Sequence, residues 1–137
     1  MAGYSGTPLV HKLGIKEGFV VGLVNPPKGF ETQLGSLPDK VRIATRLSKR
    51  IDVLVFFADT EAILKRSFAR LAEKLASNGM LWIAWPKKSS GVPTDLSFET
   101  VQRVGLQVGL VDVKICALDE VWSGLKFVYR LRDRGSR

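Results

Sequence analysis

The sequence predicts a small Rossmann-like α/β fold, a three-layer sandwich around a mostly parallel sheet with an antiparallel last strand. Three near-continuous apolar runs, 19–24, 51–58 and 79–85, are typical of strands buried on both faces of a parallel sheet. Helical patterns between buried strands imply right-handed parallel crossovers. The runs 111–118 and 125–131 alternate in hydrophobicity and are joined by a short connection, so the last strand is expected to run backwards.

The first third of the chain contributes smaller elements. One helical turn is expected over 9–13, because Thr7 can cap it and Pro8 suits its first position. The first strand ends at the turn 25–29 (Asn-Pro-Pro-Lys-Gly), which cannot continue a sheet ladder. A short helix is expected over 30–34, and a weak strand near a sheet edge over 41–43.

Two longer helices are predicted from the 3.6-residue spacing of apolar side chains. Asp59 or Thr60 caps the first, which closes at Ser77-Asn78-Gly79. Its apolar face comprises Ile63, Leu64, Phe68, Leu71 and Leu75. Thr94 and Asp95 cap the second, which ends near Gly109. Its apolar face comprises Leu96, Val101, Val104 and Val108.

Length and composition predict one domain over residues 1–131, followed by a basic, disordered tail over 132–137. The single cysteine excludes an internal disulfide and favours a reducing compartment. No apolar run reaches the roughly 18 residues of a membrane span. The amino terminus lacks a signal pattern. A cytoplasmic protein is therefore expected.

Charge is the unusual bulk property. The 137-residue chain carries 21 Lys and Arg against 13 Asp and Glu, a formal net charge of +8. Such an excess attracts polyanions, so nucleic acid is one candidate partner, and a solvated surface is the alternative. The basic residues gather at Lys40, Arg42, Arg46, Lys49 and Arg50, at Lys65, Arg66, Arg70 and Lys74, and at Arg130, Arg132, Arg134 and Arg137.

The order of elements from Ile51 to Leu131 resembles the second half of the class I methyltransferase fold: strand, helix, glycine-apolar strand, helix, strand and reversed strand. Three further segments are similar to an uncharacterised bacterial family of short cytoplasmic proteins with a domain of unknown function. They are Gly3–Leu9, Trp85–Lys88 together with Val92–Leu96, and Asp119–Lys126, which contains Trp-Ser-Gly-Leu-Lys. These resemblances imply a fold and bring no established activity, cofactor or catalytic residue.

The methyltransferase resemblance breaks at the cofactor motifs. Those enzymes place a glycine-rich loop after the first strand to approach S-adenosylmethionine, where this chain has Asn25-Pro26-Pro27-Lys28-Gly29. Two prolines remove amide donors and stiffen the turn. The acidic residue that binds a ribose after the second strand is also missing. Amino-methylating enzymes use Asn/Asp-Pro-Pro-aromatic after the fourth strand, whereas here Lys28 replaces the aromatic residue and the motif follows the first strand. The sequence therefore predicts no bound S-adenosylmethionine and no other cofactor.

A polar rim is expected where strands end and loops converge, because ligands in open α/β sheets bind outside the carboxyl ends of strands. The two lysines and hydroxyls of 87–91, placed before a helix, could bind an anionic ligand, although a solvated loop is the alternative. The carboxylates at 119 and 120 could face these lysines or form salt bridges that pin the hairpin. Trp82 is expected in the core. The candidate ligand-binding residues are Asn25, Asp59, Trp85, Lys87, Lys88, Ser89, Asp119, Glu120 and Trp122.

The sequence offers few candidate residues for catalysis or for metal binding. His11 is the only histidine, Cys116 the only cysteine, and one of each cannot make a typical structural zinc site. His11 is expected on the surface, and Cys116 is interpreted as a small buried hydrophobe. With no nucleophile–base pair and no metal site, the leading hypothesis is a non-catalytic binding module on a degenerate methyltransferase-like scaffold. The alternatives are a small transferase with a nucleotide-like cofactor and a basic nucleic-acid-associated protein.

Overall fold

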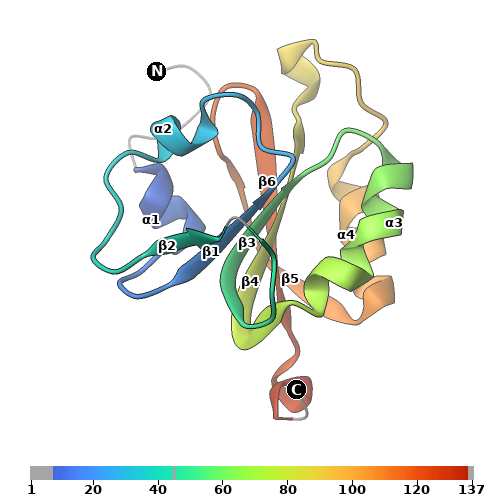
Figure 1. Ribbon diagram of the computed structural model, residues 1–137. Coiled ribbons are helices and arrows are strands. Elements are labelled where there is room, and N and C mark those ends of the chain that lie inside the picture. The colour runs from blue at the N-terminus through green and yellow to red at the C-terminus, as the bar shows by residue number, and fades with distance from the viewer. Residues whose placement is uncertain (1–7, 45, 136–137) are drawn as a thin grey trace.

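The apolar runs form the centre of a six-stranded sheet with the order β2-β1-β3-β4-β6-β5 (Figure 1). The computed structural model describes residues 8–44 and 46–135. The first four strands are β1 (Val20–Val24), β2 (Arg42–Ala44), β3 (Ile51–Phe57) and β4 (Leu75–Pro86). The last two are β5 (Leu110–Ala117) and β6 (Trp122–Tyr129).

Strand directions confirm the predicted fold class. β1 pairs in parallel with β2 and β3, and β3 pairs in parallel with β4. Only β6 is reversed, pairing antiparallel with both β4 and β5. The sheet is therefore mostly parallel with an antiparallel last strand.

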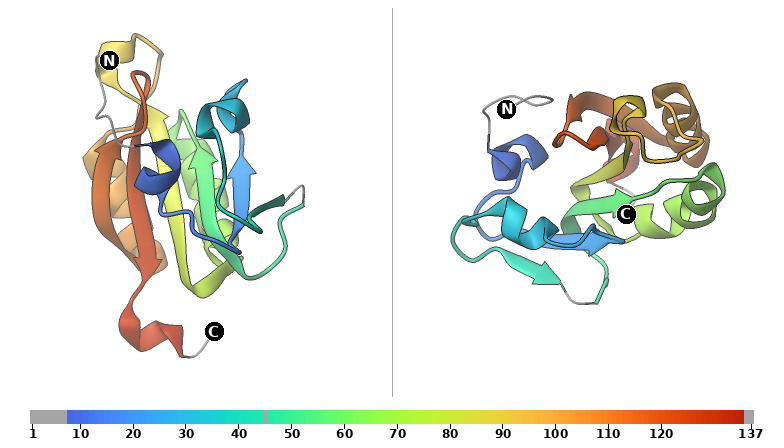
Figure 2. Two further views of the ribbon diagram at one scale, coloured as in Figure 1. Left: turned by 90° about the vertical axis from the view of Figure 1, so that its left-hand side faces the viewer. Right: turned by 90° about the horizontal axis from the view of Figure 1, so that it is seen from above.

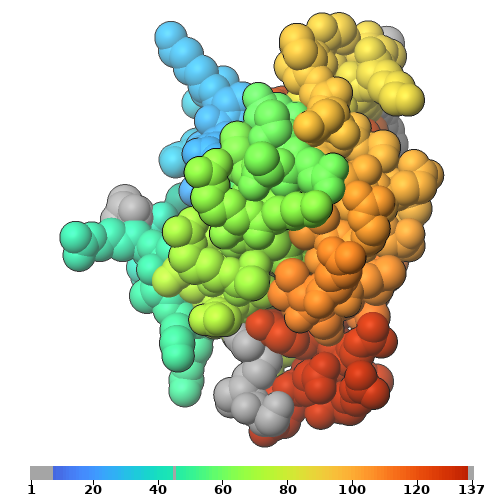
Figure 3. Space-filling view, turned by 90° about the vertical axis from the view of Figure 1, so that its right-hand side faces the viewer, coloured from blue at the N-terminus to red at the C-terminus, as the bar shows by residue number. Residues whose placement is uncertain are grey.

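Helices cover both faces of the sheet, which gives the three layers (Figures 1 and 2). α1 (Leu9–Leu13) and α2 (Phe30–Leu34) pack on one face through a core that includes Trp82. α3 (Glu61–Ala72) and α4 (Phe98–Val108) lie side by side on the other (Figure 3). On that face, Phe68 of α3 meets Phe127 of β6 edge to face, with ring centroids 5.2 Å apart. Burial of apolar surface on both faces is the main stabilising term for such a fold.

The boundary between α3 and β4 differs from the prediction. The helix ends at Ala72, and Leu75 is the first residue of β4, paired with Ile51 rather than placed on the helix. The backbone N–H of Ile51 donates to the carbonyl of Lys74 at 2.9 Å, which anchors this start. A register shift follows, and a Cβ at Gly79 would lie 2.7 Å from the Ile51 carbonyl, so the irregularity requires glycine there.

The start of α4 also differs from the prediction. Ser97 is the N-cap, and its Oγ accepts from the Thr100 N–H at 3.3 Å. Thr94 and Asp95 instead reach across to α3: Thr94 Oγ1 donates to the Asp59 carbonyl at 2.7 Å. Asp95 Oδ1 accepts from the Glu61 N–H at 2.7 Å. This segment, which follows the short helix η1 (Lys88–Ser90), thus caps a helix distant in sequence.

The start of β6 differs from the prediction, and a further helix follows the strand. β6 begins at Trp122, three residues before the predicted start at 125. Helix α5 (Leu131–Arg134) follows it, in the region where the basic tail was expected to begin. Residues 136 and 137 lie outside the described part. The same holds for residues 3–7 of the glycine-rich segment and for the proposed Thr7 cap. His11 is exposed on α1, as predicted.

Candidate functional site

A cavity of about 260 Å³ lies at the carboxyl ends of the central parallel strands. β1 has β2 on one side and β3 on the other, so the strand order reverses there. Such a switch point is where open α/β sheets bind their ligands. The cavity is lined by Asn25, Phe57, Ala58, Asp59, Ile63, Pro86, Val92 and Trp122.

Asn25 enters the cavity rim from the turn after β1. Its backbone is left-handed, with φ 55°, a conformation that asparagine adopts more readily than most non-glycine residues. The turn continues through two prolines to Gly29, the N-cap of α2, with φ 84°. The exposed Asn25 side chain is therefore held at the rim by a stiff local turn.

Asp59 lies two residues after the end of β3 and carries the one carboxylate among the lining residues. Its backbone carbonyl is taken by Thr94, and the next residue, Thr60, caps α3 by accepting from the Ile63 N–H at 3.2 Å. The Asp59 side chain is exposed. Within residues 8–44 and 46–135 its carboxylate makes no hydrogen bond or ion pair, so it is available to a ligand.

The inner wall of the cavity is aromatic. Phe57, at the end of β3, meets Trp122 of β6 edge to face at 5.1 Å between centroids. Phe30 of α2 supports Phe57 from behind at 4.8 Å. Pro86 ends β4 opposite Trp122 in the ladder. Asn25, Asp59 and Trp122, all predicted from the sequence, are thus brought together around one hollow.

Two other predicted site residues have structural roles instead. Trp85, predicted as a ligand-binding residue of the rim, is 5% exposed and packs in the core beneath α3 and α4. Asp119 Oδ1 accepts from the N–H groups of Val121 and Trp122, both at 2.8 Å. Its Oδ2 accepts from Gln33 Nε2 at 2.9 Å. This carboxylate pins the β5–β6 turn through hydrogen bonds and faces no lysine in them.

The remaining predicted residues lie beside the cavity without lining it. The Lys87 N–H donates to the Val121 carbonyl at 2.7 Å, which joins the end of β4 to the β5–β6 turn. Lys88 and Ser89 are exposed in η1, and Glu120 is exposed at the turn. The loop 87–91 and the hairpin therefore meet at one end of the sheet, as predicted, but only Trp122 of that hairpin reaches the hollow.

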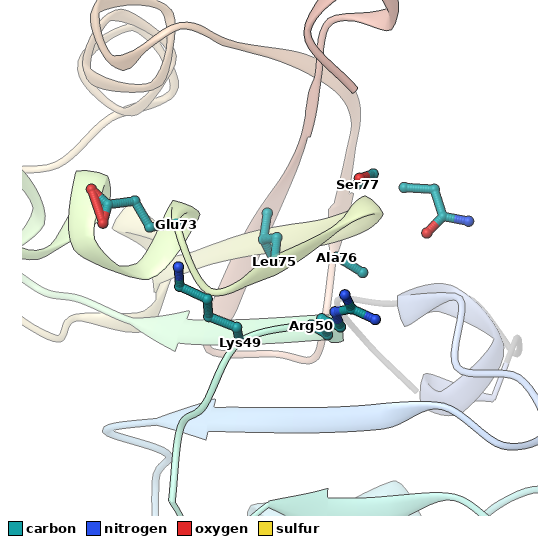
Figure 4. Close-up of a pocket in the computed structure, with 7 residues that line it drawn as sticks. Lys49, Arg50, Glu73, Leu75, Ala76 and Ser77 are labelled. Atoms are coloured by element: carbon teal, nitrogen blue, oxygen red, sulfur yellow. The ribbon is translucent and has the colours of Figure 1, made fainter. Parts of the chain in front are cut away.

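A larger hollow of about 790 Å³ lies at the opposite, amino-terminal end of β3 and β4 (Figure 4). Lys49 and Arg50 extend into it from the segment before β3, and Glu73, Ser77 and Asn78 come from the segments around the start of β4. Arg50 has φ 71°, a strained value for a residue with a side chain. Only the basic cluster was recognisable in the sequence, because the irregular start of β4, which lines this hollow, has no sequence pattern of its own.

Burial and charge also perturb two groups elsewhere on the sheet. Burial raises the pKa of the Cys116 thiol, against the opposing effect of nearby lysines. Burial, helped by Lys114, lowers the pKa of Lys126. Cys116 is half-buried in β5 rather than fully buried as predicted.

Comparison with known proteins places the fold. No protein-family model matches the chain, and no curated protein sequence matches it. The resemblance to an uncharacterised bacterial family is therefore not supported by a family model.

In the described part of the chain, no helix has the length and apolar character that a membrane span requires.

Several solved structures share the arrangement of elements. A SAM-dependent methyltransferase from Aquifex aeolicus matches with a TM-score of 0.60 and 15% identity, over 87% of this chain and 86% of that chain. A possible exported protein from Bordetella parapertussis matches with a TM-score of 0.59 and 11% identity, over 88% and 64%. Magnesium protoporphyrin IX methyltransferase from Synechocystis PCC 6803, solved with bound SAH, matches with a TM-score of 0.58 and 11% identity, over 89% and 78%.

These likenesses overturn one expectation and confirm another. The prediction of no S-adenosylmethionine rested on the loop sequence alone, and it is wrong in view of neighbours that are SAM-dependent methyltransferases, one of them holding SAH. The predicted scaffold is confirmed: the chain has the Rossmann-like α/β fold that these methyltransferases share.

Proposed function

We propose that this chain binds S-adenosylmethionine at the carboxyl ends of β1 and β3 and acts as a small transferase. The observation that carries the proposal is the hollow at the switch point of the sheet, with Asn25 and Asp59 at its rim. The fold shared with SAM-dependent methyltransferases supports the choice of ligand.

The lining residues suit one part of such a ligand. Phe57 and Trp122 offer aromatic surface to a sulfonium cation, which aromatic rings attract. Asp59 and Asn25 offer a carboxylate and an amide to hydroxyl or amino groups. Together these groups form an apolar floor with polar groups at its edge, the usual character of a small-molecule site.

Other features limit how the ligand would be held. The hollow, about 260 Å³, is smaller than the roughly 300–1,000 Å³ of typical ligand pockets. Pro26 and Pro27 supply no N–H donors. The space beside Gly29 is open, because a Cβ built there would meet nothing within 4 Å. We therefore expect the ligand to extend from the hollow over the turn 25–29.

When bound, the cofactor supplies an activated methyl group. The chain itself contributes positioning. Phe57 and Trp122 exclude water from the hollow, and the Asp59 carboxylate can accept a hydrogen bond or a proton from the hydroxyl or amino group that receives the methyl group. No other titratable side chain lines the hollow among the described residues.

Titration calorimetry with S-adenosylmethionine and S-adenosylhomocysteine tests the proposal. We expect saturable binding that weakens about tenfold in Asp59→Asn and Trp122→Phe. Glu120→Gln, which alters an exposed residue outside the hollow, should bind like the unmodified chain. Absence of heat with both ligands would overturn the proposal. Binding without formation of S-adenosylhomocysteine from hydroxyl or amino acceptors would leave a binding protein rather than a transferase.

A second candidate function is association with nucleic acid, favoured by one arrangement of charge. Basic side chains distant in sequence meet at the amino-terminal end of the sheet, here called the basic pole: Lys49, Arg50, Arg70, Lys74, Arg130, Arg132 and Arg134. The Ile51–Lys74 hydrogen bond joins the first two segments. Tyr129 Oη donates to the Ala72 carbonyl at 2.7 Å and joins the third. Such a surface suits a phosphate backbone.

A further inference from the structure

The larger hollow at the amino-terminal end of β3 and β4 has the dimensions of a ligand site (Figure 4). Its volume of about 790 Å³ falls within the roughly 300–1,000 Å³ of small-molecule pockets. Two segments distant in sequence, 49–50 and 73–78, meet around it. It is here called the basic hollow, and it is lined by Lys49, Arg50, Glu73, Leu75, Ala76, Ser77 and Asn78.

The backbone of β4 loops outward to form one wall of the basic hollow. The pairing of β3 with β4 includes Leu75 and becomes regular from Met80 onward, so four residues of β4, 76–79, stand opposite a single residue of β3. Irregularities of this kind re-aim side chains and are frequent beside ligand sites. In residues 8–44 and 46–135, the side chains of Ser77 and Asn78 form no hydrogen bond with the protein, so both can bond to a ligand.

Lys49 and Arg50 bring two positive charges to the other wall. Both are exposed, and in the described part of the chain neither forms an ion pair with a carboxylate. Arg50 has the strained φ of 71°, and strain of this kind clusters at ligand sites. The N–H of the next residue, Ile51, donates to the Lys74 carbonyl at 2.9 Å and fixes the backbone there. Glu73 is the one carboxylate in the lining, so the basic hollow carries a net positive charge.

We propose that the basic hollow binds a small molecule with a phosphate monoester group, of the class of the sugar phosphates. A phosphate monoester carries a charge of about −1.5 to −2 at neutral pH and three strong acceptor oxygens. Two cations match that charge better than they match the single charge of a carboxylate. The Arg50 guanidinium can donate two parallel hydrogen bonds to phosphate oxygens, and Lys49 acts as a compact point charge. The Ser77 hydroxyl and the Asn78 amide can donate to the same oxygens.

The lining also indicates the character of the rest of the ligand. Among the described residues, no aromatic ring lines the basic hollow, so a nucleobase would find no surface on which to stack. Hydroxyl and amide side chains suit the hydroxyl groups of a sugar. The phosphate and the sugar should therefore determine the affinity, and a base attached to the sugar should add little.

The inference rests on neither function proposed above. The basic hollow and the hollow between Asn25 and Asp59 lie at opposite ends of β3, whose seven residues separate them by roughly 20 Å. The basic hollow shares Lys49 and Arg50 with the basic pole. The backbone of a nucleic acid, however, offers phosphodiesters with one charge each rather than a monoester.

Isothermal titration calorimetry of the full chain with ribose 5-phosphate, at constant ionic strength, tests the inference. We expect saturable binding, a similar affinity for adenosine monophosphate, and no binding of ribose at the same concentrations. Lys49→Gln/Arg50→Gln should weaken the binding by at least about tenfold. Lys88→Gln/Lys114→Gln removes the same charge from exposed positions elsewhere and should bind like the unmodified chain. No binding of ribose 5-phosphate, or equal weakening in both double variants, would overturn the proposal.

Arg50→Gly separates binding from folding. Glycine adopts a left-handed φ without strain, so the thermal midpoint of unfolding should change little. The loss of the guanidinium should still weaken the binding of ribose 5-phosphate. A folded Arg50→Gly variant with unchanged affinity would contradict the proposal.

Two further measurements locate the ligand and distinguish the sources of the phosphate group. In amide NMR, ribose 5-phosphate should shift the signals of Ile51 and Gly79, and a shift confined to residues around Asp59 would refute the site. If a 5′-phosphorylated oligonucleotide binds and ribose 5-phosphate does not, the small-ligand proposal fails and association with nucleic acid stands. If ribose 5-phosphate binds and a duplex does not, this inference stands and the second candidate function fails.

Discussion

Asp119 shows how one side chain can determine the geometry of a hairpin turn. Its two oxygens accept from two backbone N–H groups of the turn and from Gln33 of α2. The N–H groups belong to Val121 and Trp122, so the carboxylate also orients the tryptophan at the hollow. Aspartate favours such local bonds to backbone groups two or three residues on.

Asp119→Ala should therefore lower the free energy of unfolding by about 1–3 kcal/mol, since it leaves backbone donors without their partner. Urea unfolding followed by tryptophan fluorescence measures the change. Glu120→Ala, one residue along and exposed, is the control and should stay within about 0.5 kcal/mol. Equal effects of the two substitutions would contradict the role assigned to Asp119.

The reactivity of the Cys116 thiol is expected to depend on pH. Because burial raises the pKa of its thiol, less thiolate is present near neutral pH than in an exposed cysteine. Reaction with a disulfide reagent at pH 7 should be at least about tenfold slower in the folded chain than in denaturant, since access and thiolate fraction both fall. The folded-state rate should still be rising above pH 9. Equal rates at pH 7 would show that the thiol is neither shielded nor perturbed.

At the scale of elements, the contact between α4 and β6 depends on Gly105. A Cβ at this position would overlap Cε1 of Phe127, so the helix approaches the sheet closely there. Gly105→Ala should cost about 1–3 kcal/mol through overpacking, although alanine favours helices in isolation. Calorimetric unfolding measures the cost. Gly135→Ala, where a Cβ meets nothing within 4 Å, should change little. Stabilisation by Gly105→Ala would refute the close contact.

The sequence predicts these elements to different degrees. β1, β3 and the core of β4 are correctly predicted because near-continuous apolar runs are typical of strands that are buried on both faces of a parallel sheet. Leu75 is misassigned because it stands four residues after Leu71, a helical spacing, while the pairing with Ile51 that places it in β4 is non-local. Asp95 resembles a cap for the next helix, and only the folded chain brings it to Glu61 of α3.

The residues of the candidate site are likewise predictable to different degrees. Asn25 and Asp59 are predictable because each follows a buried strand, and parallel strands end at a common edge. Trp85 is misassigned because a tryptophan next to a strand-ending proline can lie on the rim or in the core. The meeting of Lys114 with Lys126 depends on the register of β5 and β6, which a bulge between Asp112 and Lys114 shifts by one residue.

At the scale of the whole molecule, the basic pole and the hollow lie at opposite ends of β3. Seven strand residues separate these ends by roughly 20 Å. A polyanion on the basic pole would therefore leave the carboxyl end of the sheet free.

The basic pole predicts salt-dependent binding to nucleic acid. We expect affinity for a short duplex to fall linearly with salt on a double-logarithmic plot, as phosphate neutralisation releases counterions. Lys49→Gln/Arg50→Gln should reduce the slope by about 1–2, and Lys88→Gln at the opposite end should leave it unchanged. Fluorescence anisotropy at several salt concentrations measures the slopes. Affinity that is independent of salt, or equal effects of both variants, would contradict the prediction.

The margins of the sheet have a consequence for self-association. One margin is β2, only three residues long, and the other is β5, where Val113 and Ile115 are each about half exposed. A strand of another molecule can pair with an apolar edge of that length through backbone hydrogen bonds. The irregularity after Asp112 and the ammonium of Lys114 oppose this, because an incoming strand would meet a kinked template and an unpaired charge. The exposed charge of Lys114 thus opposes the strand-by-strand addition that would lead to fibrous aggregation.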